Sequence, residues 1–149
     1  MTLQETNQRY IRQERVPEFG SESQKKLTHA RVLVIGAGAL GCPTLQYLVA
    51  AGVGTIGIVD GDHVSVSNLH RQVLYTEADL GKPKVEVAAE RLLLMNSSVN
   101  IEKFFTILHK QNVLEMMKDF DLAIDCSDNF PTKFLVNDAC VMLGKPCVI

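Results

Sequence analysis

The 149-residue sequence contains no CxxC pair and no excess of either charge. Its cysteines, Cys42, Cys126, Cys140 and Cys147, lie within or beside apolar runs, a spacing that predicts neither a zinc site nor a disulfide framework. We therefore expect reduced thiols in a cytoplasmic protein. Lys and Arg total 15 against 17 Asp and Glu, a net charge of −2, so nothing favours nucleic acid as the main partner.

The sequence also lacks a long uninterrupted apolar run. Its first fifteen residues carry charges where a signal peptide needs an apolar stretch. The most apolar region, residues 32–53, is broken by glycines and by Pro43, which argues against a membrane partner. With 46% hydrophobic and 21% charged residues, the composition is that of an ordinary globular domain.

What is present is an alternation of short β-rich runs and helical patterns. We expect strands at 32–35, 55–59, 100–107, 122–124 and from 146, and helices at 40–51, from Pro83 onward, at 112–118 and at 130–143. This alternation predicts an α/β fold, a doubly wound, Rossmann-like and mainly parallel sheet. Residues 1–30 form a predicted N-terminal helical arm ahead of the sheet unit, 31–149, which we expect to be truncated at its fifth strand.

Gly36-Ala-Gly-Ala-Leu-Gly41 follows a predicted strand and opens a helix, the context in which GxGxxG indicates nucleotide binding. Gly36 permits a tight turn, Gly38 lets phosphate approach the backbone, and Gly41 allows close packing of helix on strand. Asp60, at the end of the second strand, is placed to accept hydrogen bonds from ribose hydroxyls. These residues alone favour NAD-dependent oxidoreduction, and a glycine turn that only packs a helix is the alternative without a ligand.

Two further segments suit phosphate better than nicotinamide chemistry. The polar loop 62–72 offers Asn68, Arg71 and Gln72, an amide-and-guanidinium set that matches phosphate oxygens, although a solvated surface loop is the alternative. Lys84 falls in the first helical turn after Pro83, where a cation opposes the helix dipole. It is either part of an anion site or a lysine that faces solvent.

The segment Asp125-Cys-Ser-Asp-Asn129 follows the fourth predicted strand. In a sheet of order 3-2-1-4, strands one and four flank the switch point where ligands bind, so Asp128 and Asn129 should lie across from the glycine loop. A carboxylate beside a triphosphate needs a bridging cation, which predicts Mg²⁺ at Asp128. Alternatively Asp128 or Asn129 only caps the next helix, and both roles can hold.

Attack on a nucleotide α-phosphate needs the metal and the cations, whereas hydride transfer needs neither. Attack on a nucleotide α-phosphate is therefore favoured over hydride transfer. An NAD(P)-dependent oxidoreductase and a non-catalytic nucleotide-binding or dimerisation module remain alternatives.

The sequence closely resembles the ThiF/MoeB family of adenylyltransferases, relatives of the ubiquitin-activating enzymes. The resemblance runs through residues 9–13, 36–41, 60–72, 81–88 and 125–140, and the combination of SNLxRQ with CSDN is more specific than the glycine motif. Two positions depart from the family pattern: Ala39, where many members carry glycine, and Lys133, which is often arginine.

The resemblance implies adenylation, with ATP and Mg²⁺, of the C-terminal Gly-Gly carboxylate of a ubiquitin-like sulfur-carrier protein of ThiS or MoaD type. Pyrophosphate would be released, in thiamine or molybdopterin biosynthesis or a related sulfur transfer. A relative that adenylates a tRNA base is conceivable, but the near-neutral charge gives it no support. Structural Zn²⁺ and the acceptor cysteine belong to a C-terminal half that the family carries beyond this sequence.

Carried over by position, the resemblance also assigns roles to single residues. Asp60 would hold the ribose, and Ala39 would line the nucleotide. The phosphates would be met by Ser67, Asn68, Arg71 and Lys84, and Asp128 would serve the metal and the chemistry. Arg12 matches an arginine that reaches into the partner subunit's site, which implies a homodimer. None of the four cysteines is assigned as a nucleophile.

Overall fold

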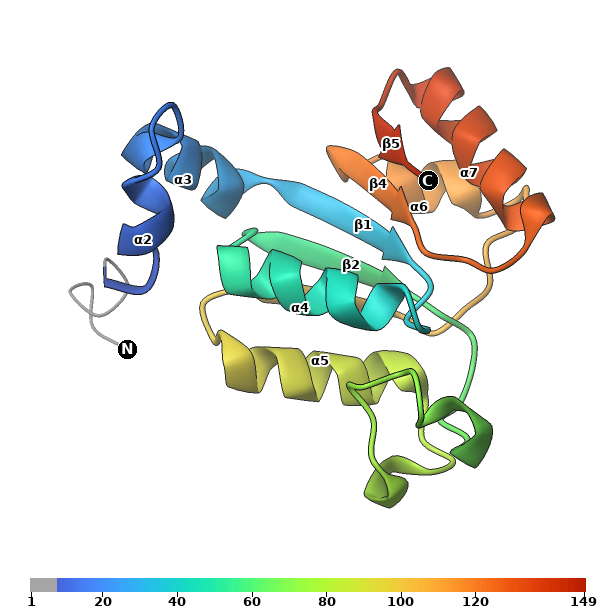
Figure 1. Cartoon of the computed structure of the whole chain (residues 1–149). Coiled ribbons are helices and arrows are strands. Elements are labelled where there is room, and N and C mark those ends of the chain that lie inside the picture. Colours follow the sequence, from blue (N-terminus) through green and yellow to red (C-terminus); the bar gives the residue numbers. More distant parts are fainter. Residues whose placement is uncertain (1–7) are drawn as a thin grey trace.

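The structure is a computed structural model that describes residues 8–149; the first seven residues of the predicted arm lie outside the described residues. Five parallel strands form one sheet in the order β3-β2-β1-β4-β5 (Figure 1). They are β1 (Arg31–Ile35), β2 (Thr55–Val59), β3 (Asn100–Phe104), β4 (Leu122–Asp125) and β5 (Cys147–Val148). The predicted doubly wound, parallel α/β fold is confirmed.

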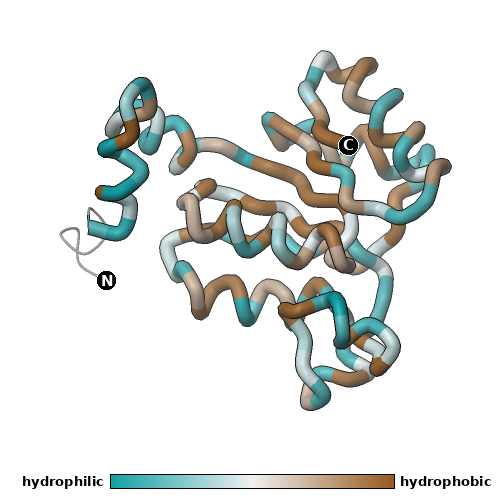
Figure 2. Tube along the Cα trace, in the orientation of Figure 1, coloured by the Kyte–Doolittle hydropathy of each residue, from teal (hydrophilic) through white to brown (hydrophobic). Residues whose placement is uncertain are grey.

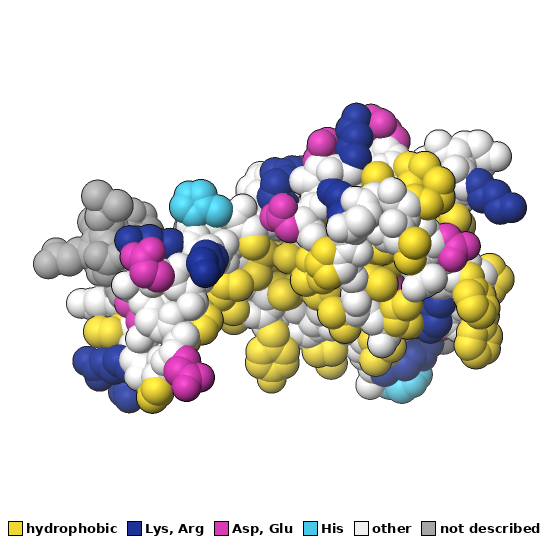
Figure 3. Space-filling model, turned by 90° about the horizontal axis from the view of Figure 1, so that it is seen from above, with side chains coloured by type: hydrophobic (Ala, Val, Ile, Leu, Met, Phe, Trp, Pro, Cys, Tyr) yellow, Lys and Arg dark blue, Asp and Glu magenta, His cyan; other side chains and the backbone are white. Residues whose placement is uncertain are grey.

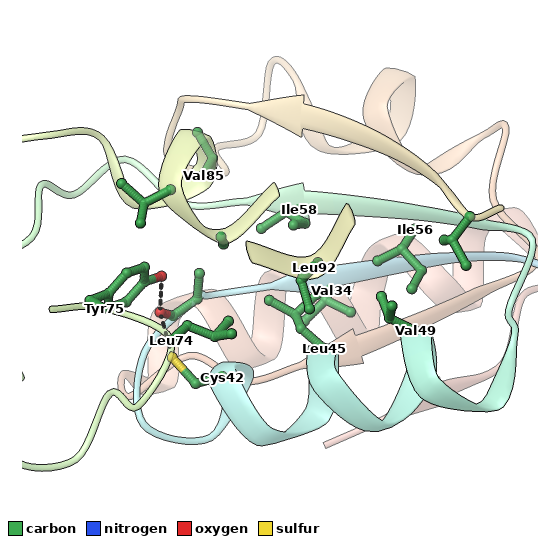
Figure 4. Close-up of a cluster of buried hydrophobic side chains, with 14 of the residues drawn as sticks. Val34, Cys42, Leu45, Val49, Ile56, Ile58, Leu74, Tyr75, Val85 and Leu92 are labelled. Atoms are coloured by element: carbon green, nitrogen blue, oxygen red, sulfur yellow. Dashed lines mark hydrogen bonds between the residues drawn. The ribbon is translucent and has the colours of Figure 1, made fainter. Parts of the chain in front are cut away.

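The central strand β1 is apolar and buried from Val32 to Ile35 because both faces of the sheet are covered by helices. Helices α4 (Gly41–Ala51) and α5 (Lys84–Met95) cover one face, where Leu45 and Val49 of α4 and Leu92 of α5 are fully buried (Figure 4). Helices α6 (Val113–Met117) and α7 (Phe130–Leu143) cover the other face. Each such side chain removed from water contributes about 1.5–3 kcal/mol to folding.

The helices begin and end at residue types that are typical of helix caps. Gly52 and Gly144 end α4 and α7 in the left-handed conformation, with φ of 85° and 63°. Asn129 caps α7 by accepting a hydrogen bond from the Thr132 backbone N–H at 3.0 Å. Pro83 immediately precedes α5, as predicted.

The prediction that the third strand extends to residue 107 is wrong, since β3 ends at Phe104. Phe104 pairs with Val59, the last residue of β2, so the ladder has no further partner strand. The Asp60 and Thr106 backbone N–H groups both donate to the Phe104 carbonyl, at 3.2 and 2.9 Å, and the chain turns away there. Residues 106–108 therefore form a loop beside the sheet end. Two short 3₁₀ helices, η1 (Val66–Asn68) and η2 (Glu77–Asp79), were also not predicted.

The N-terminal arm consists of α2 (Ile11–Glu14) and α3 (Gly20–His29), and it lies at the amino ends of the strands (Figure 1). Figure 2 shows the arm to be mainly hydrophilic and the strands hydrophobic. The arm is attached by specific contacts: the Asn96 side-chain amide donates to the Tyr10 hydroxyl at 2.8 Å, and Gln13 and Gln24 both donate to the Ala51 carbonyl. Within residues 8–149, no helix is both long and apolar enough to cross a membrane.

Candidate functional site

A crevice of about 370 Å³ opens at the carboxyl ends of β1, β2 and β4. This is the switch point of the sheet, because the chain leaves β1 toward one side and β4 toward the other. The crevice is lined by the glycine loop, the ends of the strands, the polar loop after β2, the start of α5, the loop after β3 and the start of α7.

The glycine loop has the predicted geometry. Gly36 has φ of 94°, and its N–H donates to the Val59 carbonyl at 2.7 Å. A Cβ on Gly41 would lie 1.9 Å from the Gly36 carbonyl oxygen, so only glycine allows α4 to begin this close to the loop. Gly41 itself does not line the crevice and acts by packing.

Beneath the loop, two buried side chains converge on one carbonyl. The Tyr75 hydroxyl donates to the Ala37 carbonyl at 2.7 Å, and the Cys42 thiol approaches the same oxygen at 3.5 Å (Figure 4). Burial raises the pKa of the Tyr75 hydroxyl and of the Cys42 thiol, so both groups stay protonated at neutral pH and remain donors. The carbonyl is thereby held inward, and the Gly38 backbone is left on the crevice side.

Asp60 is held rigidly at the end of β2. One carboxylate oxygen accepts the Ala37 backbone N–H and the other accepts the Asp62 backbone N–H, both at 2.8 Å. Each carboxylate oxygen can accept more than one hydrogen bond, so Asp60 can still accept ribose hydroxyls from the crevice.

Lys84 is buried at the crevice wall, which excludes the alternative of a solvent-facing lysine. Its side chain is 4% exposed, and its ammonium contacts the Asp62 carboxylate at 2.9 Å. The Asp62 side chain, by contrast, is 71% exposed. A buried ammonium on the crevice wall provides a fixed positive charge for an anion that enters.

Two buried polar atoms at the crevice have no hydrogen-bond partner within the described part of the chain. They are Oε1 of Gln72 and Oγ of Ser127, and both residues line the crevice. Buried polar atoms without partners are rare in folded proteins and call for a ligand or water. They lie on two sides of the crevice, because Gln72 belongs to the loop after β2 and Ser127 follows β4.

Of the remaining residues predicted to contact phosphate, some line the crevice and one does not. Arg71 and Asn68 line the crevice, whereas Ser67 does not. Ser67 instead orients the arginine, because its carbonyl accepts from the Arg71 guanidinium at 2.9 Å. Within residues 8–149 Arg71 forms no ion pair, so its charge is available to a ligand.

The segment after β4 combines a helix cap with a carboxylate at the crevice. Asn129 caps α7 and also lines the crevice. Asp128 is exposed and lines the crevice beside it. Asp125 is buried: its carboxylate accepts the Ser127 backbone N–H at 2.8 Å and lies 3.5 Å from the Lys133 ammonium. Lys133 is thus the counter-ion of a buried carboxylate.

No group of three metal-ligating side chains occurs in the described region. Asp128 nevertheless fits Mg²⁺, since this ion is commonly held by one or two carboxylates together with substrate phosphates. The fit rests on the exposed Asp128 and on Lys84 and Arg71, which line the same crevice and could hold the phosphates of a ligand.

The structure thus brings together most of the predicted site residues in one crevice: Gly36, Gly38, Ala39, Asp60, Asn68, Arg71, Gln72, Lys84, Asp128 and Asn129. Arg12 is exposed on α2, at the opposite end of the sheet from the crevice of its own chain. Sequence reasoning missed Asp62, Ser127 and the 106–108 loop as part of the site. The 106–108 loop was missed because residues 105–107 were assigned to the third strand. Asp62 and Ser127 lie in the segments 62–72 and 125–129, so their position next to predicted site residues was a signal that could have identified them.

Comparison with known proteins gives the family. The ThiF family model matches residues 10–149. The chain is 56% identical over 140 residues to a sulfur carrier protein adenylyltransferase of Thermus thermophilus, covering 94% of this chain and 52% of that protein. It is 47% identical to the adenylyltransferase and sulfurtransferase MOCS3 of Danio rerio, covering 94% of this chain and 30% of the relative. The chain therefore spans about half or less of the length of these relatives.

Solved structures with a similar fold support the same family assignment. Escherichia coli tRNA N6-threonylcarbamoyladenosine dehydratase, TcdA, superposes with a TM-score of 0.89 at 27% identity, over 95% of this chain and 59% of TcdA. Escherichia coli MccB, solved with ATP, gives 0.78 at 32% identity, over 83% of this chain and 37% of MccB. On the match to nearly its whole described length, this chain belongs to the ThiF family.

Proposed function

We propose that this chain is the nucleotide-binding part of an ATP-dependent adenylyltransferase that activates the C-terminal Gly-Gly carboxylate of a ubiquitin-like sulfur-carrier protein. The observation that carries the proposal is the buried Lys84 ammonium on the wall of a glycine-loop crevice that Arg71 also lines. A hydride-transferring site needs no fixed cation at this position, whereas a triphosphate does.

In the proposed reaction, a carboxylate oxygen of the carrier attacks the α-phosphorus of ATP. The bond from that phosphorus to the bridging oxygen breaks, and pyrophosphate leaves with the electron pair, so the products are an acyl adenylate and pyrophosphate. Lys84 and Arg71 are placed to offset the negative charge on the phosphoryl and leaving oxygens. Asp128 would hold Mg²⁺, which supplies further charge neutralisation.

The comparisons support the nucleotide and the class of substrate. TcdA and MccB have both been solved with ATP. The relatives at 56% and 47% identity carry names that specify adenylyltransferase activity, and the first name specifies a sulfur carrier protein as its object. The tRNA-modifying TcdA shares only 27% identity, so a tRNA substrate has less support.

Several finer features belong to the same proposal. Residues 1–30 serve as an arm on the ATP-binding unit 31–149, Arg12 completes the site of the second subunit in a homodimer, and the protein works in the cytoplasm. The pathway would be thiamine or molybdopterin biosynthesis, or a related sulfur transfer.

The first test compares thermal stabilisation of the chain by Mg-ATP and by NAD. A ligand at a hundred times its Kd stabilises by about 2.7 kcal/mol, enough for a clear shift in Tm. We expect a shift with Mg-ATP alone, and a shift with NAD alone would refute the proposal. Carrier-dependent exchange of pyrophosphate into ATP then tests adenylation, and Asp128→Asn should abolish that exchange while largely sparing ATP binding.

A further inference from the structure

The pairing of Lys84 with Asp62 is asymmetric. The ammonium is almost fully buried, and Asp62 is its one ion-pair partner among residues 8–149. The carboxylate is mostly exposed, so it can leave the ammonium for water at little cost in solvation. Lys84 cannot do the same, because a buried ammonium without a counter-ion is strongly disfavoured.

The Asp62 backbone is fixed while its side chain is not. Its N–H donates to an Asp60 carboxylate oxygen at 2.8 Å, and its carbonyl accepts the Lys84 backbone N–H at 3.0 Å. Separating the carboxylate from the ammonium therefore needs only a side-chain rotation, with no shift of the loop or of α5. Both residues line the crevice, so the vacated position faces any ligand there.

We propose that Asp62 is a displaceable counter-ion, which holds Lys84 in the free protein and yields it to a phosphate group of the bound nucleotide. This inference rests on the proposed function, since it takes the crevice to bind nucleotide phosphates. Every ligand that uses Lys84 must compete with Asp62, and a ligand without phosphate has no such competition. Asp62 thus weakens nucleotide binding and selects for strongly charged ligands.

The test is calorimetric titration of wild type and Asp62→Asn with ATP and with adenosine, with Mg²⁺ and in EDTA. Removing the competitor should tighten ATP binding about three- to tenfold, the range of a charged hydrogen bond reduced by solvent screening. Adenosine binding should not change. Asp119→Asn, an exposed carboxylate at the far end of β4, removes the same charge and should leave ATP affinity unaltered.

A double variant shows whether the effect passes through Lys84. In the Lys84→Met background, Asp62→Asn should change ATP affinity less than twofold. Asp62→Ser, which offers the ammonium a neutral acceptor, replaces Asp62→Asn if melting curves show that the latter does not fold.

Three results would overturn the inference: ATP affinity unchanged or weakened in Asp62→Asn, an equal gain for adenosine, or a gain that persists without Lys84. Weakening confined to the Mg²⁺ titration would make Asp62 a metal ligand instead. Absence of ATP binding by the wild type would refute the proposed function and this inference together. Failure of the inference alone would appear only in the Asp62 variants, so the two failures can be distinguished.

Discussion

Among residues 8–149, the buried polar groups that have one partner or none concentrate around one crevice. The Lys84 ammonium is buried against a single exposed carboxylate, and the buried oxygens of Gln72 and Ser127 have no partner in the described region. Each of these groups costs free energy in the free protein, because hydrogen bonds to water have been given up without full replacement. A polar ligand with phosphate and hydroxyl groups supplies the missing partners.

The strongest test of this view at a single residue is Lys84→Ala. Loss of the buried ammonium should weaken ATP binding by about 1.5–3 kcal/mol, the value of a hydrogen bond to a charged group. Calorimetric titration measures it, and Lys26→Ala, which removes an exposed lysine from α3, should bind ATP as the wild type does. Unchanged ATP affinity in Lys84→Ala would exclude a phosphate contact for this residue.

A second residue acts from beneath the loop. Tyr75→Phe removes the donor to the Ala37 carbonyl and leaves only the weak thiol donor of Cys42. We expect the free energy of unfolding to fall by about 1 kcal/mol and the ATP Kd to rise severalfold, because the glycine loop loses its inward anchor. Urea denaturation and titration measure the two effects. The matched control is Tyr47→Phe on the surface of α4, where neither value should change.

At the scale of elements, the long connection between β2 and α5 carries six crevice residues and needs its own anchor. Asp79 of η2 supplies it: the carboxylate accepts from the Thr76 N–H at 3.0 Å and the Thr76 hydroxyl at 2.8 Å, and pairs with Lys82 and with Arg91 of α5, both at 3.2 Å. These contacts tie the connection back to the helix that bears Lys84. The site therefore depends on a capping box outside the crevice.

Asp79→Asn should lower the free energy of unfolding by about 1–2 kcal/mol at neutral pH. The hydrogen bonds from Thr76 lower the pKa of the Asp79 carboxyl below its ordinary value of 3.8. A group whose pKa is lower in the folded state stabilises above its unfolded pKa and loses that contribution as the pH falls through the folded value. The difference between variant and wild type should therefore shrink below about pH 4.

Urea denaturation at neutral pH and at about pH 3.5 measures this difference. Asp138→Asn, at an exposed position of α7, should match the wild type at both values. A difference for Asp79→Asn that stays constant with pH would show that its charge is not what stabilises the connection.

At the scale of the whole molecule, the sheet separates the crevice from the N-terminal arm. The crevice lies at the carboxyl ends of the strands, and the arm with Arg12 lies at the amino ends (Figure 1). Arg12 can therefore serve a crevice only in another subunit. Figure 3 shows hydrophobic side chains gathered across the middle of one face of the molecule. Separately, the exposed apolar side chains include Phe134 and Val141 of α7 and Val148 of β5.

The proposed homodimer can be tested by mixing two inactive variants, Arg12→Ala and Lys84→Ala. In a two-fold dimer, a heterodimer of these variants has one damaged and one intact site. An equal mixture after subunit exchange should recover about a quarter of wild-type pyrophosphate exchange, because half the dimers are mixed and each has one intact site of two. If Arg12 acts within its own chain, the mixture will show no recovery beyond the separate variants, and if Arg12 has no role in the site, Arg12→Ala will by itself retain pyrophosphate exchange.

Local pattern alone determined the parallel sheet, the order of its elements and most of the crevice. The buried apolar strands, the glycine caps and Pro83 act through short-range geometry, so their positions could be read from neighbouring residues. The carboxyl ends of parallel strands meet at one edge, and from this rule we expected Asp60 at the end of the second strand and Asp128 across from the glycine loop; both line the crevice.

Tertiary structure decided what depends on distant partners. The third strand stops at Phe104 because Phe104 pairs with Val59, the last residue of β2, and no local pattern gives this register between the two strands. Whether Lys84 faced solvent or the crevice could not be read from its position in a helix, since its burial depends on the packing of the loop after β2. The roles of Asp62, Tyr75 and Ser127 likewise came only from the fold, because burial and hydrogen-bond satisfaction are properties of the packed chain.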